Sequence, residues 1–185
     1  WVNWVKAGRP TDTDAILEIM GESVQGDRGA ESVLGAWRNN AYRALQTEDP
    51  WEIVLSGPKV DSFMRNLVGA LEEVTNDAWM ANFAFIDQAV FGGSLNAAGT
   101  DPGKTPGYLA MSAKVRRVAA LLTKQTGELW TPAHVQETVW SWAKTSYELA
   151  SSTGKTVLEL VQEGAITGDM IAATPDFGSM FADDA

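Results

Sequence analysis

The chain contains no cysteine and only one histidine, His134. The lack of cysteine excludes disulfides, thiolate metal sites and cysteine-bound iron–sulfur clusters, and it fits a reducing compartment. A single histidine excludes metal sites built from several imidazoles, and near a helix start we expect His134 to be a surface or capping residue. The segment Gly154-Lys155-Thr156 is not a phosphate loop, since the required upstream glycine is replaced by Leu149. We therefore expect neither a metal nor a cofactor.

Long apolar runs are also missing. No stretch approaches the 18 consecutive apolar residues of a membrane helix, and no signal-peptide pattern opens the chain. We therefore expect no membrane partner and no secretion through a signal peptide. The chain begins with Trp1 rather than Met, so we expect a processed chain or a domain cut from a longer protein.

Basic residues are few, with 14 Lys and Arg against 24 Asp and Glu, for a net charge of -10. This balance argues against broad nucleic-acid binding but permits a local basic patch. Residues 102–127 carry five basic residues and no acid, namely Lys104, Lys114, Arg116, Arg117 and Lys124. We expect Lys114, Arg116 and Arg117 to contact phosphate. The alternative is a solvated helix face paired with acids elsewhere.

Hydrophobic residues make up 45% and charged residues 21% of the 185 positions, which suits a globular domain with a sizeable core. Apolar residues recur at helical spacing, and no strand alternation or internal repeat is present. The sequence predicts an all-α fold of seven to nine helices. We expect a single helical domain over residues 1–174 and a flexible acidic tail over 175–185.

Caps and spacing predict individual helices. The first predicted helix begins near Thr11–Asp14. The others cover about 30–46, 49–55, 59–69, 77–90, 108–126, 131–150, 156–164 and 167–173. The helix over 77–90 is apolar nearly all round, so we expect it to be the central, buried one. Residues 91–107 are rich in Gly, Asn, Thr and Pro and predict a functional or mobile loop.

Residues 57–79 have the most distinctive pattern. Gly57-Pro58 opens a short amphipathic helix, an acidic turn follows, and Thr75 or Asn76 is expected to cap the next helix, with Asp77 at its head. The helix dipole favours an ionised Asp77. Such a carboxylate could stabilise oxocarbenium charge during cleavage of an N-glycosidic bond. The alternative is a plain N-cap or first-turn acid.

This order of elements resembles the helix-hairpin-helix DNA glycosylases of the endonuclease-III class. The matching segments are Leu55-Ser56-Gly57-Pro58-Lys59 for the turn and Val74-Thr75-Asn76-Asp77-Ala78-Trp79 for the aspartate. A phage branch, the glutamyl/putrescinyl-thymine pyrophosphorylase-like proteins, is more similar. It matches in order at Lys59, Phe63, Asn66, Leu67, Gly69, Val74, Thr75, Asp77 and Trp79. The chain departs from the superfamily pattern because the hairpin lacks its second glycine and Pro58 removes a backbone N–H.

The resemblance implies roles for four residues. Asp77 would be the key carboxylate and Lys59 a Schiff-base nucleophile. Trp79 would stack on an extruded base and Asn66 would bond a base edge. The alternatives are a surface or phosphate-contacting Lys59, a core Trp79, and an Asn66 that ties the hairpin to the loop of Asp77.

The implied function is a phage DNA glycosylase-like or modified-thymine-processing domain that acts on a base in DNA. The alternative is a non-catalytic helical structural or interaction module of a virion-associated phage protein. The resemblance implies DNA and other domains of a larger phage protein as partners, in the host cytoplasm or the virion. An open cleft at Asp77 would favour the enzyme, and a carboxylate capped under packed side chains would favour the module.

Overall fold

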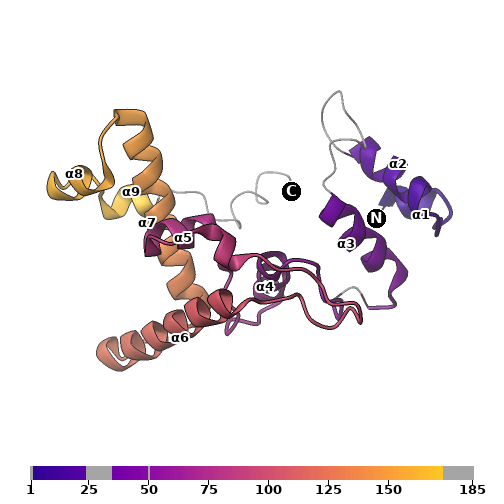
Figure 1. The fold of residues 1–185 in the computed structure, drawn as a ribbon, viewed down its shortest axis with the longest axis horizontal. Helices are drawn as coiled ribbons and strands as arrows, with labels where there is room; N and C mark the ends of the chain where they lie inside the picture. Colours follow the sequence, from indigo (N-terminus) through magenta and orange to yellow (C-terminus); the bar gives the residue numbers. More distant parts are fainter. Residues whose placement is uncertain (1, 24–34, 50, 173–185) are drawn as a thin grey trace. The chain divides into compact units, whose positions relative to one another are not determined.

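The computed structural model describes residues 2–23, 35–49 and 51–172 (Figure 1). These residues form nine α-helices and one 3₁₀ helix, with no strand among them, so the predicted all-α fold is confirmed. The predicted acidic tail over 175–185 lies outside the described residues. None of the described helices combines the length and the apolar character that a membrane crossing needs.

The chain divides into two compact units, which are taken separately below. Unit 1 comprises Trp1–Asp61 and Gly93–Lys104, and unit 2 comprises Ser62–Gly92 and Thr105–Ala185. The division falls within α4 (Pro58–Leu67). The single domain over 1–174 stays a prediction.

Unit 1 contains α1 (Val2–Lys6), α2 (Thr13–Ser23) and α3 (Gly35–Gln46). The predicted start of α2 is confirmed, because the Asp12 carboxylate accepts the N–H of Ala15 at 3.0 Å. Helix α1 was not predicted. Beside it, the Trp4 indole donates to the carbonyl of Pro10 at 2.8 Å, and the Arg9 guanidinium lies 5.9 Å from the Trp4 ring. These contacts hold the chain where it leaves α1.

The predicted helix from Asp49 to Leu55 is wrong, because residues 51–55 form no helix. Side chains of α3 hold the backbone after this point instead. The Asn40 amide donates to the Ser56 carbonyl at 3.2 Å and accepts the Ser56 N–H at 2.7 Å. Arg43 donates to the Val54 carbonyl at 2.8 Å. The backbone groups of this segment therefore find partners without a helical ladder.

The loop over 93–104 completes unit 1. Asn96 organises its tip, since its side-chain oxygen accepts the N–H groups of Thr100 at 2.8 Å and Asp101 at 3.1 Å. The two sides of the loop lie backbone against backbone, and a Cβ on Gly93 would lie 1.9 Å from the carbonyl oxygen of Gly103. Only glycine permits this approach.

The frame of unit 2 consists of two long helices, α6 (Pro106–Thr126) and α7 (Pro132–Thr153). Each has a threonine N-cap followed by proline, Thr105 for α6 and Thr131 for α7. Each is followed by a left-handed glycine, Gly127 with φ 75° and Gly154 with φ 67°. The predicted Thr131-Pro132 start is confirmed, and α6 begins two residues before the predicted position.

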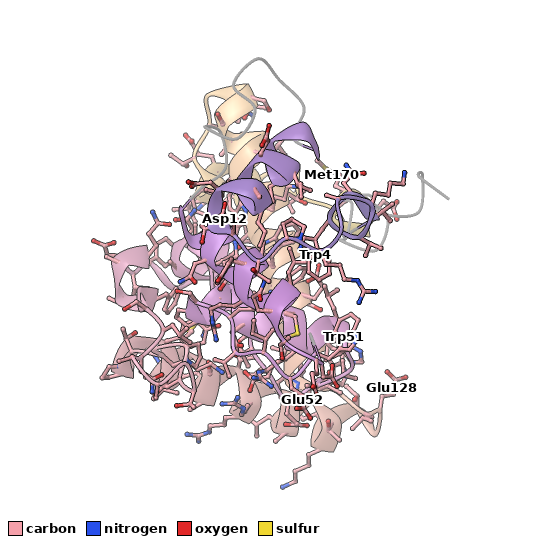
Figure 2. All side chains as sticks on the ribbon, turned by 90° about the vertical axis from the view of Figure 1, so that its right-hand side faces the viewer. Trp4, Asp12, Trp51, Glu52, Glu128 and Met170 are labelled. Carbon is pink, nitrogen blue, oxygen red and sulfur yellow. The ribbon has the colours of Figure 1, made fainter. Side chains whose placement is uncertain are left out.

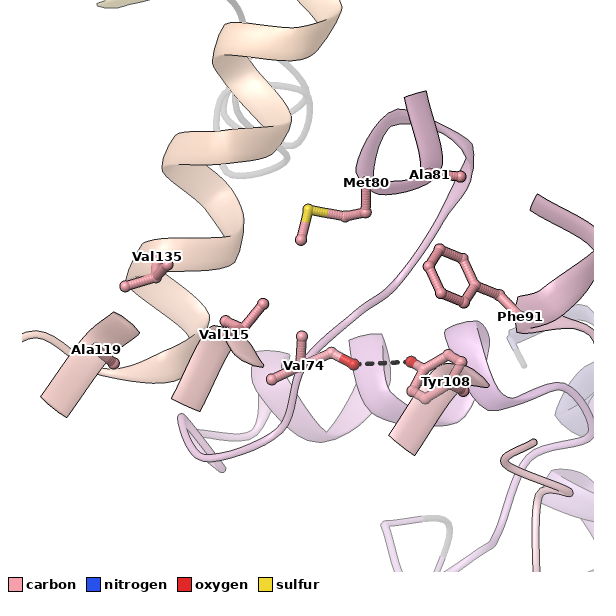
Figure 3. Packing of buried hydrophobic residues seen from close by; sticks show 8 residues of the cluster. All are labelled: Val74, Met80, Ala81, Phe91, Tyr108, Val115, Ala119 and Val135. Atoms are coloured by element: carbon pink, nitrogen blue, oxygen red, sulfur yellow. Dashed lines mark hydrogen bonds between the residues drawn. The ribbon is translucent and has the colours of Figure 1, made fainter. Parts of the chain in front are cut away.

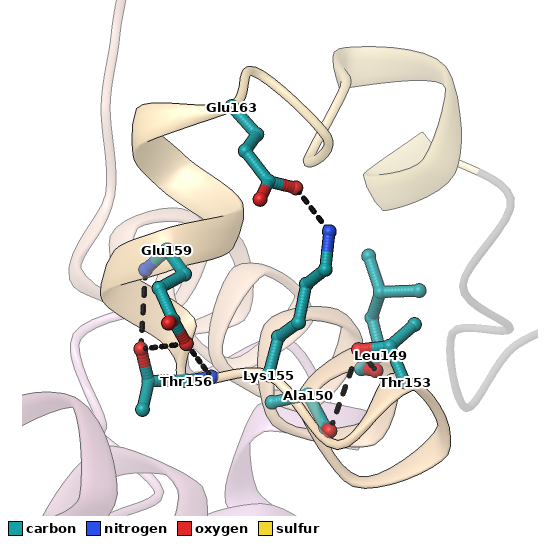
Figure 4. A network of polar contacts seen from close by, with 7 residues as sticks. All are labelled: Leu149, Ala150, Thr153, Lys155, Thr156, Glu159 and Glu163. Atoms are coloured by element: carbon teal, nitrogen blue, oxygen red, sulfur yellow. Dashed lines mark hydrogen bonds and ion pairs between the residues drawn. The ribbon is translucent and has the colours of Figure 1, made fainter.

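Two short helices, α8 (Val157–Gln162) and α9 (Gly168–Ala172), pack against α7. A capping box starts α8. The Thr156 hydroxyl accepts the Glu159 N–H at 3.2 Å, and the Glu159 carboxylate accepts the Thr156 N–H at 2.7 Å (Figure 4). Nearby, Lys155 forms an exposed ion pair with Glu163 at 2.5 Å.

The predicted helix over 77–90 is wrong. It is divided into α5 (Ala78–Ala84) and the 3₁₀ helix η2 (Gln88–Phe91). Helix α5 ends at Ala84, and its C-cap residue Phe85 adopts the left-handed conformation with φ 55° and ψ 41°. Asp87 then starts a new turn by accepting the Ala89 N–H at 2.8 Å. The expectation of a buried helix also fails, because Phe85 is 88% exposed and only Met80 and Ala81 of α5 are buried.

The core of unit 2 gathers side chains from α5, η2, α6, α7 and the segment before α5 (Figure 3). Its buried members are Val74, Met80, Ala81, Phe91, Tyr108, Val115, Ala119 and Val135. Tyr108 is fully buried, meets Phe91 edge to face at 5.9 Å and donates its hydroxyl proton to the Val74 carbonyl at 2.7 Å. This bond fixes the strand-like approach to Asp77 against α6.

Candidate functional site

Asp77 lies at the junction between the approach segment and α5. It is the N-cap residue, in place of the expected Thr75 or Asn76. One carboxylate oxygen, Oδ1, accepts the backbone N–H groups of Trp79 at 3.0 Å and Met80 at 3.2 Å. These are N–H groups of the first turn that have no carbonyl partner within the helix. The local structure therefore uses half of the carboxylate as a helix cap.

The other oxygen of Asp77 reaches α7. Oδ2 accepts the indole N–H of Trp140 at 3.0 Å, across 63 residues of sequence. The ammonium group of Lys144, one turn further along α7, lies 5.1 Å from the centroid of the Trp140 ring. Asp77 is half-buried, and its carboxylate receives these three donors from two helices. The arrangement joins α5 to α7 and holds the carboxylate in one orientation.

Asn66 closes the loop that leads to Asp77. Its amide nitrogen donates to the carbonyls of Ala70 at 3.1 Å and Glu73 at 3.0 Å. Its amide oxygen accepts the hydroxyl of Thr75 at 2.9 Å. These bonds fit the alternative expectation for Asn66, in which it connects the hairpin to the loop of Asp77. A base edge could bond to this amide only in competition with these contacts.

Trp79 is a half-buried residue of the first turn of α5. Its ring centroid is 6.3 Å from that of Tyr147, with the planes tilted by 49°. One turn further, Phe83 meets Trp142 edge to face at 5.7 Å. Trp79 thus belongs to a row of aromatic contacts that packs α5 on α7, which is the packing alternative for this residue.

The most buried polar side chain beside Asp77 is Asn76, which is 1% exposed. Its amide nitrogen donates to the carbonyl of Tyr108 at 3.2 Å and to the hydroxyl of Ser112 at 2.9 Å. Its backbone N–H donates to the Tyr108 hydroxyl at 3.2 Å. The Asn76 amide oxygen is buried and has no hydrogen-bond partner among the described residues. These contacts make the approach to Asp77 a rigid part of the core.

Sequence reasoning gave Trp140 and Ser112 no role, although they hold Asp77 and Asn76. Trp140 follows Asp77 by 63 residues and Ser112 follows Asn76 by 36 residues. Sequence spacing carries no signal for such pairs. The helical periodicity of α7 places Trp140 and Lys144 on one face, and only that part was open to prediction.

The remaining predicted residues belong to α4 and α6. Lys59 is exposed in the first turn of α4, in unit 1. Arg116 is exposed on α6 and donates from Nε at 3.2 Å and Nη2 at 3.0 Å to the carbonyl of Glu72. Its guanidinium therefore fastens the turn after α4 onto α6. Lys114 and Arg117 are exposed on α6.

Three exposed cations share one side of α6, at spacings of three and seven residues. We call them the basic strip, formed by Lys114, Arg117 and Lys124. Helix α6 carries no acidic residue, and Leu121, within the strip, is 47% exposed. No group of three His, Cys, Asp or Glu side chains that could hold a metal ion occurs within the described residues. The basic strip is therefore a set of cations on the surface of one helix.

Comparisons with known proteins bear on the family of the chain. No curated protein and no solved structure matches the chain. Residues 17–147 match the family of unknown function DUF7178. Because the match extends over more than half of the sequence, the chain belongs to this family.

Proposed function

We propose that the chain is a non-catalytic helical module that binds the backbone of double-stranded DNA along the basic strip of α6. The carrying observation is the charge of this helix. Within a chain of net charge -10, the 21 residues of α6 hold four basic residues and no acid. Arg116 donates to the carbonyl of Glu72, and the three cations of the strip are exposed.

The strip has dimensions that suit a duplex. Its first and last members are ten residues apart, which corresponds to about 15 Å along a helix. A duplex of that length carries roughly nine phosphate charges. Lysine and arginine side chains at this spacing can contact several phosphates without reading bases, and such contacts position a protein on DNA.

The geometry of Asp77 favours a module over an enzyme. A glycosylase carboxylate has to face the sugar or a water molecule at the reacting carbon. In this chain Oδ1 caps α5 and Oδ2 accepts the Trp140 indole. Using Asp77 in catalysis would cost the contacts that hold α5 on α7. The phage origin and a place within a larger virion-associated protein, both implied by the resemblance, belong to the same proposal.

The test is fluorescence anisotropy of a labelled 20-base-pair duplex, titrated with the full chain at about 20 mM salt, a low ionic strength that strengthens phosphate contacts. Binding through three cations predicts that the logarithm of the affinity falls with the logarithm of salt at a slope of about -2.7. Replacing Lys114, Arg117 and Lys124 together by glutamine should abolish binding. The matched control carries Lys6→Gln, Arg9→Gln and Lys155→Gln, which changes the net charge equally at sites outside the strip.

Equal loss in the control and in the strip variant would contradict the proposal, because net charge alone would then explain binding. Absence of any binding at low salt would contradict it as well. Catalysis is tested separately, by mass analysis of nucleosides after incubation with modified phage DNA. If the wild-type chain releases or alters a base and folded Asp77→Asn does not, the module is an enzyme.

A further inference from the structure

Unit 1 contains a pocket that the sequence did not indicate. Its volume is about 590 Å³, and it lies between the last turns of α3, the segment over 52–54 and the turn at 99–100. Small-molecule sites usually measure about 300–1,000 Å³, whereas one water takes about 30 Å³. The pocket is therefore large enough for an organic molecule.

Arg43 gives this pocket its chemistry. Its half-buried guanidinium donates from Nη1 to the Val54 carbonyl at 2.8 Å, and no acidic side chain among the described residues pairs with it. Gly99 is also close to the guanidinium, since a Cβ at this position would lie 3.4 Å from Nη2. Because Gly99 has no side chain and a φ of +71°, the backbone can pass close to the guanidinium. One N–H holds the fork in place, and a guanidinium has five such donors.

The walls around Arg43 are fixed before any ligand arrives. Asn40 bonds both backbone groups of Ser56, one turn of α3 away from Arg43. The turn that carries Thr100 is closed by the side chain of Asn96. A site whose walls are already ordered loses less entropy on binding.

We infer that this pocket binds a small organic anion. A carboxylate or phosphate oxyanion pairs with the Arg43 guanidinium, which matches such groups with two parallel N–H bonds. The rest of the ligand packs against Tyr42, Ile53 and Val54, which line the pocket beside Arg43. Glu52, labelled in Figure 2, is an exposed lining residue and opposes a second negative charge. The preferred ligand is therefore a monoanion with an apolar or aromatic body.

The experiment is a ¹H–¹⁵N NMR titration of the full chain with four probes: acetate, inorganic phosphate, benzoate and thymidine 5′-monophosphate. We expect saturable shifts of the Val54, Gly99 and Thr100 amides. Benzoate, a monoanion with an aromatic body, should saturate at a lower concentration than acetate, which lacks that body, and than inorganic phosphate and the nucleotide, which carry more than one negative charge near neutral pH. Shifts confined to α6, or no shift with any probe, would overturn the inference.

Two substitutions predict effects of opposite sign. Arg43→Gln should weaken the tightest probe at least about tenfold, because a charge-assisted hydrogen-bonded pair is lost. Glu52→Gln should strengthen it about two- to fivefold at low salt, with a smaller effect at high salt. Among the described residues the Glu52 side chain takes part in no hydrogen bond or ion pair, so we expect this variant to keep the fold. Arg9→Gln is the control and should leave the affinity unchanged, and weaker binding in Glu52→Gln would refute the anion site.

Discussion

Replacing Asp77 by asparagine keeps a good N-cap residue but changes its contact with α7. Asparagine can still accept the N–H groups of Trp79 and Met80 through its one oxygen. The atom that faces the Trp140 indole then becomes an NH₂ group, and two donors oppose each other. The variant therefore removes the acceptor of the 3.0 Å bond between Asp77 and Trp140 and leaves an oxygen for the cap.

The bond to the Trp140 indole sets the expected magnitude. A hydrogen bond to a charged group contributes about 1.5–3 kcal/mol, so we expect Asp77→Asn to lower the free energy of unfolding by about 2 kcal/mol. For a chain of this size, such a loss lowers Tm by about 4–8 °C. Trp140→Phe removes the indole N–H, so the NH₂ group of Asn at position 77 no longer faces another donor. In that background, Asp77→Asn should cost less than about 0.5 kcal/mol, which leaves a coupling energy of at least about 1 kcal/mol.

Urea unfolding at 25 °C, followed by far-ultraviolet circular dichroism, measures the four proteins of this cycle. The two single variants, the double variant and the wild type must show equal m-values for the comparison to hold. If Asp77→Asn costs the same with and without the Trp140 indole, the bond does not stabilise the contact of α5 with α7. Oδ2 of Asp77 would then not be needed for the contact between the two helices, and the reasoning for a module would fail.

Three further predictions concern unit 2 and the loop of unit 1. Tyr108→Phe should lower the unfolding free energy by about 2–3 kcal/mol, because it strands two buried backbone groups, whereas Tyr147→Phe, at an exposed hydroxyl, should cost less than about 1 kcal/mol. Gly93→Ala should cost about 1–3 kcal/mol in the same urea assay, because a Cβ has no room there. Hydrogen bonds from the backbone N–H of Thr156 and then from its hydroxyl hold the pKa of Glu159 below its ordinary value of 4.5, so ¹³C NMR should show that Thr156→Val, which removes the hydroxyl bond alone, raises it in part.

The sign of the Glu159 effect follows from the lowered pKa. The ionised carboxylate stabilises the start of α8 above the pKa of the unfolded chain, and this contribution is lost as the pH falls through the folded pKa. A Glu159 pKa that does not respond to Thr156→Val would contradict the hydrogen bond from the Thr156 hydroxyl to the Glu159 carboxylate. Equal costs for the two tyrosine variants, or a neutral Gly93→Ala, would contradict the contacts assigned to them.

The all-α class and several helix boundaries could be predicted because their signals are local. Thr131-Pro132 starts α7 and Thr156 starts α8, since a cap and its N–H partners lie within three residues of each other. The helix over 77–90 failed for the opposite reason. Its apolar composition suggested continuity, but Phe85 adopts a left-handed conformation that nothing in its identity indicates.

The candidate site was open to prediction only in part. The position of Asp77 at a helix head came from local pattern, and so did the proposed tie through Asn66. Its partner Trp140 could not be identified, because pairing between distant helices depends on how they pack. The non-helical segment over 51–55 could not be predicted for the same reason, because Asn40 and Arg43 of α3 supply hydrogen bonds that no local pattern indicates.

The corner between α6 and α7 bears on how unit 2 folds. The Thr123 hydroxyl donates to the Trp130 carbonyl at 3.3 Å and accepts the Trp130 N–H at 2.9 Å, seven residues away. Because Thr123 and Trp130 are only seven residues apart, their two hydrogen bonds can form with little loss of loop entropy. Contacts between close residues form fastest, and we expect the α6–α7 corner to be the folding nucleus of unit 2. The segment with Asn76 and Asp77 would dock afterwards, when Tyr108 and Trp140 already stand in place to receive it.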